Sequence, residues 1–166
     1  MTCVVWFLGA SLPSVYAELV VGDVFPSLTA AGLSGGAVPA TEGRVVLVDF
    51  WASWCAPCKA SFPAYARIDA DYAPRGLLIV AISVDEKAEA YRAFVKKWQP
   101  SFAVLRDGEQ KLVRAVAVPA MPTSYLLGRD GRVRSVHQGF HGSSTESELR
   151  KEIDAVLAEK TSSSSS

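Results

Sequence analysis

A Cys-x-x-Cys pattern, formed by Cys55 and Cys58, lies between two regular segments of this chain. The segment before it, 44–53, is a run of β-branched, aromatic and other apolar residues that is long enough for a buried strand. The segment after it carries large side chains at helical spacing and stops at a proline and a glycine, which predicts a helix over 57–73. The cysteine pair is therefore expected where a strand ends and a helix begins.

A position at the start of a helix favours thiol chemistry. A cysteine that attacks disulfides must be a thiolate near neutral pH, so its pKa has to fall below the free value of about 8.5. A helix N-terminus lowers this pKa, because its unpaired N–H groups and positive dipole end stabilise the thiolate. Pro57 suits the first helical turn, where its missing N–H costs nothing. We predict that Cys55 is the nucleophile and that Cys58, one turn further in, is the resolving cysteine.

Binding a metal and stapling the fold are the other uses of such a pair. The chain has three cysteines, the third being Cys3, whereas a structural disulfide framework needs more of them, spread more widely. Zinc takes three or four protein ligands. The remaining candidates are Cys3, His137 and His141, and none of them repeats the paired spacing. The sequence therefore predicts a redox-active pair, with no metal and no other cofactor.

Composition narrows the class of protein. The chain has 166 residues, of which 49% are hydrophobic, so it can bury the core of one domain, predicted over 18–160. Its 17 basic and 17 acidic residues leave no net charge, which argues against a nucleic-acid partner. No apolar run is long enough to span a bilayer. The last residues, 161–166, read TSSSSS and predict a disordered tail.

The first residues, 1–17, have the layout of a secretory signal peptide. They contain no charged residue, and the apolar stretch Val4–Leu12 precedes small residues at positions −3 and −1 of a cleavage site before Glu18. A signal peptide normally begins with Lys or Arg, which is missing here, so an uncleaved N-terminal anchor and a buried strand stay as alternatives. The export interpretation places the cysteine pair in an oxidising compartment.

The rest of the domain alternates between strand and helix patterns. The predicted elements are a buried strand over 76–85, an amphipathic helix over 86–100, a short strand in FAVLRD, a short helix in GEQKLVRAVAV, a hairpin over 123–139, and a closing helix in STESELRKEIDAVLAEK capped by Ser144 or Thr145. This order predicts an α/β fold, in which a mixed sheet is flanked by helices on both faces.

Two stretches resemble the thioredoxin superfamily. VDFWASWCAPCKASFP is similar to its active-site segment, with matches at Asp49, Trp54, Lys59 and Pro63. Downstream, MPTSYLLGRDGRV resembles the cis-proline loop of that superfamily and the hairpin that follows it. The resemblance implies a cis peptide bond between Met121 and Pro122.

The resemblance also implies roles for residues around the cysteines. Asp49, on the strand below the pair, is expected to accept the proton of Cys58 during exchange. The cis-proline loop, with Met121, Pro122 and Thr123, is expected to lie against the dithiol and to bind an extended peptide by its backbone. Trp54 is expected to offer the substrate an apolar contact.

Further features resemble the TlpA/ResA-like thiol–disulfide oxidoreductases, which are exported or membrane-tethered bacterial proteins. Cys58 and Pro122 lie 64 positions apart, and the surplus over a minimal thioredoxin is a strand and helix around 76–100. The signal-like start and the hairpin agree with this subfamily. The resemblance implies a monomeric periplasmic reductant of protein disulfides, re-reduced by a membrane electron donor. Its substrates would belong to cytochrome c maturation or be cysteines of copper sites.

Other functions remain open at this point. A disulfide oxidase or isomerase would use the same fold, although the Ala-Pro dipeptide between the cysteines resembles the reducing members. A copper metallochaperone would hold its metal through Cys55 and Cys58. A peroxidase of the peroxiredoxin type would place a lone attacking cysteine in a Thr-rich loop, which this sequence lacks.

Overall fold

The computed structural model describes residues 17–159. The predicted tail, 161–166, and all but the last residue of the predicted signal peptide or anchor, 1–17, lie outside the described residues. The elements, in chain order, are β1 (Val45–Trp51), α1 (Ala56–Tyr72), a 3-10 turn (Ala73–Arg75), β2 (Leu77–Ser83), α2 (Ala88–Trp98), β3 (Ala103–Arg106), α3 (Lys111–Val116), β4 (Thr123–Leu127), β5 (Val133–Gln138) and α4 (Ser143–Ala158). Within 17–159, no helix combines the length and the apolar character needed to cross a membrane.

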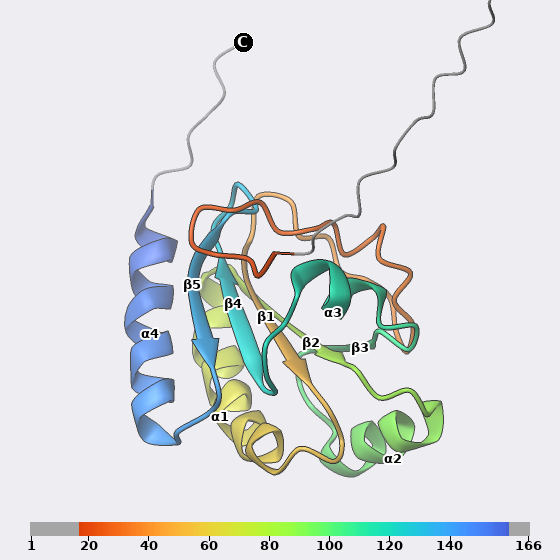
Figure 1. The fold of residues 1–166 in the computed structure, drawn as a ribbon. Coiled ribbons are helices and arrows are strands. Elements are labelled where there is room, and N and C mark those ends of the chain that lie inside the picture. The colour runs from red at the N-terminus through yellow and green to blue at the C-terminus, as the bar shows by residue number, and fades with distance from the viewer. Residues whose placement is uncertain (1–16, 160–166) are drawn as a thin grey trace, which may run out of the picture.

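The five strands form one mixed sheet in the order β3-β2-β1-β4-β5 (Figure 1). β1, β2 and β3 run parallel, whereas β4 is antiparallel to both of its neighbours, β1 and β5. α1, α2 and α4 cover one face, and α3 with the segment before β1 covers the other (Figure 1). The predicted mixed sheet flanked by helices on both faces is therefore confirmed.

Alternation along β1 decides what faces the site. Successive side chains of a strand point to opposite faces of the sheet. Trp51 packs against Phe62 of α1 at 5.0 Å between ring centroids, and Asp49 accepts a hydrogen bond from Tyr65 of the same helix. Trp51 and Asp49 therefore both face α1. Phe50 points the other way and meets Phe25 of the N-terminal segment at 6.5 Å. The α1 side of β1 thus carries one buried carboxylate among aromatic rings.

An aromatic cluster fixes α1 and α2 against the sheet. Phe94 of α2 lies 4.3 Å from the Trp51 ring and 4.9 Å from the Phe62 ring, measured between centroids. Trp98 stacks on Phe94 at 5.4 Å, and Phe102 packs against Phe62 at 5.5 Å. Burying several aromatic side chains together contributes more than any other interaction to holding such elements in place. The first turns of α1 therefore pack against a rigid aromatic core.

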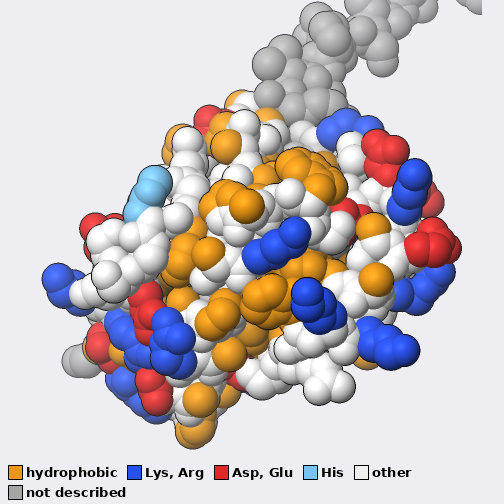
Figure 2. Space-filling view, turned by 90° about the horizontal axis from the view of Figure 1, so that it is seen from below, with side chains coloured by type: hydrophobic (Ala, Val, Ile, Leu, Met, Phe, Trp, Pro, Cys, Tyr) orange, Lys and Arg blue, Asp and Glu red, His pale blue; other side chains and the backbone are white. Residues whose placement is uncertain are grey.

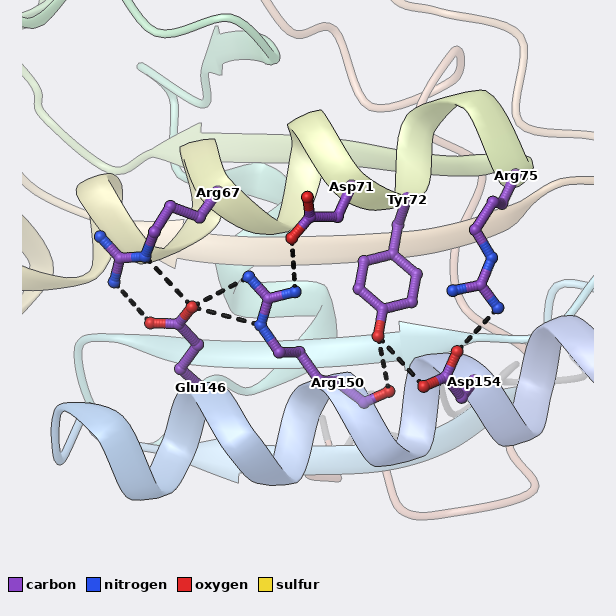
Figure 3. Close-up of polar contacts among 7 residues, drawn as sticks. All are labelled: Arg67, Asp71, Tyr72, Arg75, Glu146, Arg150 and Asp154. Atoms are coloured by element: carbon purple, nitrogen blue, oxygen red, sulfur yellow. Dashed lines mark hydrogen bonds and ion pairs between the residues drawn. The ribbon is translucent and has the colours of Figure 1, made fainter.

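Polar side chains join α1 and the 3-10 turn that follows it to α4. Figure 3 shows these contacts, which involve Arg67, Asp71, Tyr72, Arg75, Glu146, Arg150 and Asp154. Glu146 accepts hydrogen bonds from Arg67 and Arg150, and its side chain is only 15% exposed. Arg150 also pairs with Asp71 at 2.7 Å. Such a network fixes the angle between the two helices better than isolated surface pairs do.

The N-terminal segment pairs with both outer strands. Gly22 N donates to Val133 O and Val133 N donates to Asp23 O, each at 2.9 Å, beside β5. Further along, Ser34 and Arg106 exchange two backbone hydrogen bonds of 2.9 and 2.7 Å beside β3. The segment thus crosses the sheet from one outer strand to the other.

The closing helix begins differently from the prediction. Its N-cap is Gly142, and both predicted caps, Ser144 and Thr145, lie inside the first turn, so the prediction was wrong. The Thr145 hydroxyl instead accepts from His141 N at 3.0 Å, which ties the preceding loop to the helix. A helix start without a capping side chain is tolerated because this turn packs on the folded domain.

Candidate active site

The cysteine pair lies at the junction of β1 and α1, as predicted. α1 begins at Ala56, one residue before the predicted start, and Cys55 is its N-cap. Cys55 and Cys58 are joined by a disulfide bond. Cys58 N lies 3.2 Å from Cys55 Sγ and donates to it. The N-terminal N–H groups of α1 are therefore directed at the sulfur predicted to be the nucleophile.

The two sulfurs differ in their access to solvent. Cys55 is 5% exposed, whereas Cys58 is fully buried beneath the first turn of α1. The residue before the nucleophile, Trp54, is 70% exposed, while Trp51 belongs to the core. An incoming disulfide can therefore reach Cys55 before Cys58, and it meets Trp54 beside it.

A buried carboxylate that the sequence did not single out holds the loop before Cys55. Asp85, just after β2, is 3% exposed and accepts hydrogen bonds from Ser53 N (3.1 Å) and Ser53 Oγ (2.9 Å). The Ser83 hydroxyl donates to Asp85 Oδ2, the oxygen that also accepts from Ser53 N, at 2.8 Å. The signal in the sequence is an acidic residue closing an apolar strand, at an edge of the sheet where parallel strands end together. Asp85 thereby positions the backbone that carries Trp54.

Asp49 lies on β1 and faces α1 in a site closed to solvent. Tyr65 OH donates a hydrogen bond of 2.9 Å to Asp49 Oδ1. Oδ2 has no hydrogen-bond partner among the described residues. Burial raises the pKa of Asp49 from 3.8 to about 8, against a smaller lowering by the Tyr65 hydrogen bond. A carboxyl group with such a pKa can both take and return a proton near neutral pH.

The cis-proline loop lies at the same end of the sheet as the cysteines. The peptide bond between Met121 and Pro122 is cis, as the resemblance implied. Thr123 begins β4 and pairs with Phe50, so the loop stands beside the end of β1 from which the cysteine loop departs. Pro122 O accepts from Gly139 N at 2.7 Å, and the buried Thr123 hydroxyl donates to Ala120 O at 2.8 Å. Met121 is the one of the three predicted loop residues that keeps some exposed surface.

The surface around the disulfide is apolar at its centre. Figure 2, which views the molecule from this end, shows hydrophobic side chains gathered across the middle of the face with Lys and Arg side chains among them. A groove of about 460 Å³ runs beside Trp54, and its lining includes Ser53, Trp54, Asp85, Lys87 and Gln110. A surface of this kind suits a protein partner.

The two histidines lie apart from the cysteines in sequence and in role. His137 lies in β5 and bonds with Glu152 of α4 through Nε2 at 2.7 Å. His141 is exposed, and its backbone N–H is the group bonded by Thr145. Across residues 17–159, no three His, Cys, Asp or Glu side chains are grouped as metal ligands would be.

Comparisons with known proteins find a matching family and relatives that are thiol-disulfide oxidoreductases. The Redoxin family model matches residues 20–153. Thiol-disulfide oxidoreductase ResA of Bacillus cereus (strain ZK / E33L) is 30% identical over 118 residues, which cover 70% of this chain and 68% of that protein. ResA of Bacillus thuringiensis subsp. konkukian is 27% identical over 141 residues, which cover 84% of this chain and 80% of that protein.

Solved structures give the same picture. A Chlorobium tepidum protein assigned as a thiol:disulfide interchange protein, DsbE, superposes with a TM-score of 0.78 at 34% sequence identity. The match covers 85% of this chain and all of that one. The predicted thioredoxin-like fold is confirmed by this likeness.

Proposed function

Since the chain belongs to the Redoxin family and is a thiol–disulfide oxidoreductase with a thioredoxin-like fold, we propose that it serves as a reductant of protein disulfides. Its substrates contain disulfides, and Cys55 is the residue that attacks them. The proposal goes beyond the class of enzyme in giving the reaction a direction, a compartment and a source of electrons.

The reaction follows from the order in which the sulfurs become accessible. The Cys55 thiolate attacks a substrate disulfide, so a Cys55–substrate bond forms and one substrate sulfur leaves as a thiolate. Cys58 then attacks Cys55, the mixed disulfide breaks, and the second substrate sulfur leaves. Two electrons pass from the dithiol to the substrate, and the protein is left with the Cys55–Cys58 disulfide that the structure contains.

The two residues between the cysteines support the proposal that the protein acts as a reductant. A strongly oxidising member of this fold has a reduced form stabilised around its thiolate. Here Ala56 and Pro57 provide neither a positive charge nor a side-chain donor for Cys55. The thiolate is left with the helix N-terminus as its stabilising group. A modestly stabilised dithiol gives up its electrons more readily, which favours a reductant.

A redox titration of the Cys55–Cys58 couple tests this direction. The full chain is equilibrated in defined thiol buffers, and the free thiols are trapped and counted. We expect a potential near about −270 mV, the value of a reducing thioredoxin, and catalysis of insulin reduction. A potential near about −120 mV, the value of a strong oxidase, would overturn the proposal. Tight stoichiometric copper binding without reductase activity would instead identify a metallochaperone.

We further propose that the protein works in the periplasm as a monomer and receives electrons from a membrane donor. The uncharged apolar stretch within residues 1–17 supports export. An oxidising compartment supports the need for a donor, because a dithiol spent there is not restored by cytosolic thiols. Cytochrome c maturation and the cysteines of copper sites are the two proposed destinations of the electrons, on the resemblance to the TlpA/ResA-like proteins.

Expression of the full chain in a bacterium tests the localisation. We expect the protein in the periplasmic fraction, with a mass showing cleavage after Ala17, or in the inner-membrane fraction with an intact N-terminus. Either result agrees with an exported protein, and the mass decides between signal peptide and anchor. Recovery of the full-length chain from the cytosol alone would rule out export.

A further inference from the structure

A small polar cluster is buried between α1 and the sheet. It consists of Asp49 on β1, Ser124 on β4, and Ser61 and Tyr65 on α1, all of them buried. Asp49 and Ser124 are direct partners across the two antiparallel strands. Apart from this cluster, the layer between α1 and β1 is built of large apolar side chains such as Phe62 and Ile68. Buried polar groups are costly, so their grouping calls for a physical role.

The spacing along α1 places two members of this cluster, Ser61 and Tyr65, on the same helix face as Cys58. Positions i, i+3 and i+7 lie on one face of a helix, and Cys58, Ser61 and Tyr65 have this spacing. All three are buried, so their shared face is the one turned to the sheet. The Ser61 hydroxyl donates to Cys58 O at 2.9 Å. Because Tyr65 OH reaches Asp49, the carboxylate and Cys58 lie in the same closed layer.

We propose that Tyr65 is a positioning residue for the exchange reaction: its hydroxyl holds Asp49 Oδ1, and Oδ2 is left as the oxygen that takes the proton of Cys58. The proposal rests on the proposed function, and within that reaction on the role of proton acceptor that the resemblance to the thioredoxin superfamily implies for Asp49. The two oxygens of Asp49 differ in the way that the proposal needs. Oδ1 is bonded to Tyr65 at 2.9 Å, and Oδ2 is buried without a partner among residues 17–159.

The step moves one proton and exchanges one disulfide bond for another. In the mixed disulfide, Cys58 gives its proton to Asp49 Oδ2 and becomes a thiolate. The thiolate attacks Cys55 Sγ, the Cys55–Cys58 bond forms, and the bond between Cys55 and the substrate breaks. The substrate sulfur leaves with the bonding electron pair and is protonated by water. Asp49 then returns its proton to solvent before the next turnover.

Tyr65 also sets the pH range of this step. The neighbours of Asp49 are Tyr65 from α1, Ser124 from β4 and Ala81 from β2, and Ser61 of α1 lies next to the Tyr65 hydroxyl. Among these Tyr65 titrates, and burial together with Asp49 raises its pKa well above 10, so its hydroxyl stays a donor. The hydrogen bond from Tyr65 lowers the pKa of Asp49, and its loss moves that pKa further up.

The experiment separates the two sulfur steps with a chromogenic disulfide. Reduced full-length protein is mixed rapidly with dithiobis(nitrobenzoate), a disulfide whose released thiolate is coloured. One coloured thiolate is released when Cys55 attacks, and a second when Cys58 resolves the mixed disulfide. For Tyr65→Phe we expect an unchanged first phase. The second phase should have a pH midpoint about one unit higher and a rate about tenfold lower at pH 7, as expected for a lost hydrogen bond to a charged acceptor.

Tyr125→Phe is the matched control. Tyr125 is equally buried, but its hydroxyl has no partner among the described residues, so both phases should keep the parent rates and midpoints. Carboxyl NMR titration of the oxidised proteins supplies a second measurement that needs no activity: the pKa of Asp49 should be higher in Tyr65→Phe than in the parent. An unchanged second-phase midpoint in Tyr65→Phe would overturn the proposal.

Asp49→Asn distinguishes this failure from failure of the underlying role. If Asp49→Asn slows the second phase while Tyr65→Phe does not, Asp49 is the acceptor and Tyr65 has no part in positioning it. If Asp49→Asn leaves the second phase intact, both ideas fail together. The redox potential of the pair decides the direction of catalysis independently of either result.

Discussion

Cys58→Ser is expected to turn the enzyme into a trap for its substrates, whereas Cys55→Ser is expected to abolish reaction with them. Turnover in insulin reduction should fall at least about a thousandfold in both variants, because each removes one of two sulfurs that act as a unit. The variants should nevertheless differ in what they capture, because the outer sulfur alone can form the mixed disulfide.

The structure gives the reason for this asymmetry. Cys55 caps α1 and accepts the N–H of Cys58, while the Cys58 sulfur is fully covered. Non-reducing gels of cell extracts should show disulfide-linked adducts of the Cys58→Ser variant, which disappear on adding a reductant. The Cys55→Ser variant is the matched control and should show none. Adducts formed mainly through Cys58 would reverse the assignment of nucleophile and resolving cysteine.

Asp49→Asn is expected to stabilise the protein at neutral pH by about 2–4 kcal/mol. The pKa of Asp49 is 3.8 when unperturbed and about 8 in the fold. Between these values the unfolded chain has ionised Asp49 while the folded protein keeps it protonated, so unfolding releases a proton and stability falls as pH rises. Below pH 3.8 both states are protonated and this penalty is absent. The gain from asparagine should therefore grow from pH 4 to pH 8.

Urea unfolding at a series of pH values measures this gain. Asp85→Asn provides the control, because Asp85 is also buried but accepts hydrogen bonds from both serines that flank the site. Its loss of charge should destabilise the protein by about 1–3 kcal/mol, since charged hydrogen bonds are weakened. Equal stability of Asp49→Asn and the parent at pH 8 would contradict the prediction. If Asp49→Asn is more stable than the parent but exchanges disulfides more slowly, the protein keeps the Asp49 carboxyl group for catalysis at a cost in stability.

The fold and the cysteine pair could be predicted because they depend on local patterns. Apolar runs at 44–53 and 76–85 mark the two central strands, and helical spacing after Cys58 marks α1. The proximity of Met121 and Pro122 to that pair came from resemblance, since no local pattern brings two segments so far apart in sequence to one edge of a sheet.

The polar contacts that position the site could not be predicted in the same way. Tyr65 was recognisable as a buried position of a helix, but its hydroxyl meets a carboxylate 16 residues away on another element. Asp85 and Ser53 are 32 residues apart. Such pairs depend on the register between β1, β2 and α1, which apolar periodicity does not determine. The predicted N-cap of α4 was wrong for a related reason. A serine or threonine near the start of a helix does not determine which residue begins the helix.

The pairing of the N-terminal segment with the two outer strands has a consequence for association. The outer strands of an open sheet present unpaired N–H and C=O groups, which can template edge-to-edge joining with another molecule. Residues 22–24 occupy part of this edge on β5, and Ser34 occupies part of it on β3, which is itself only four residues long. The N-terminal segment thus covers part of both edge strands. Proteolytic cleavage within this segment would expose these edges and leave a folded domain that is prone to aggregate.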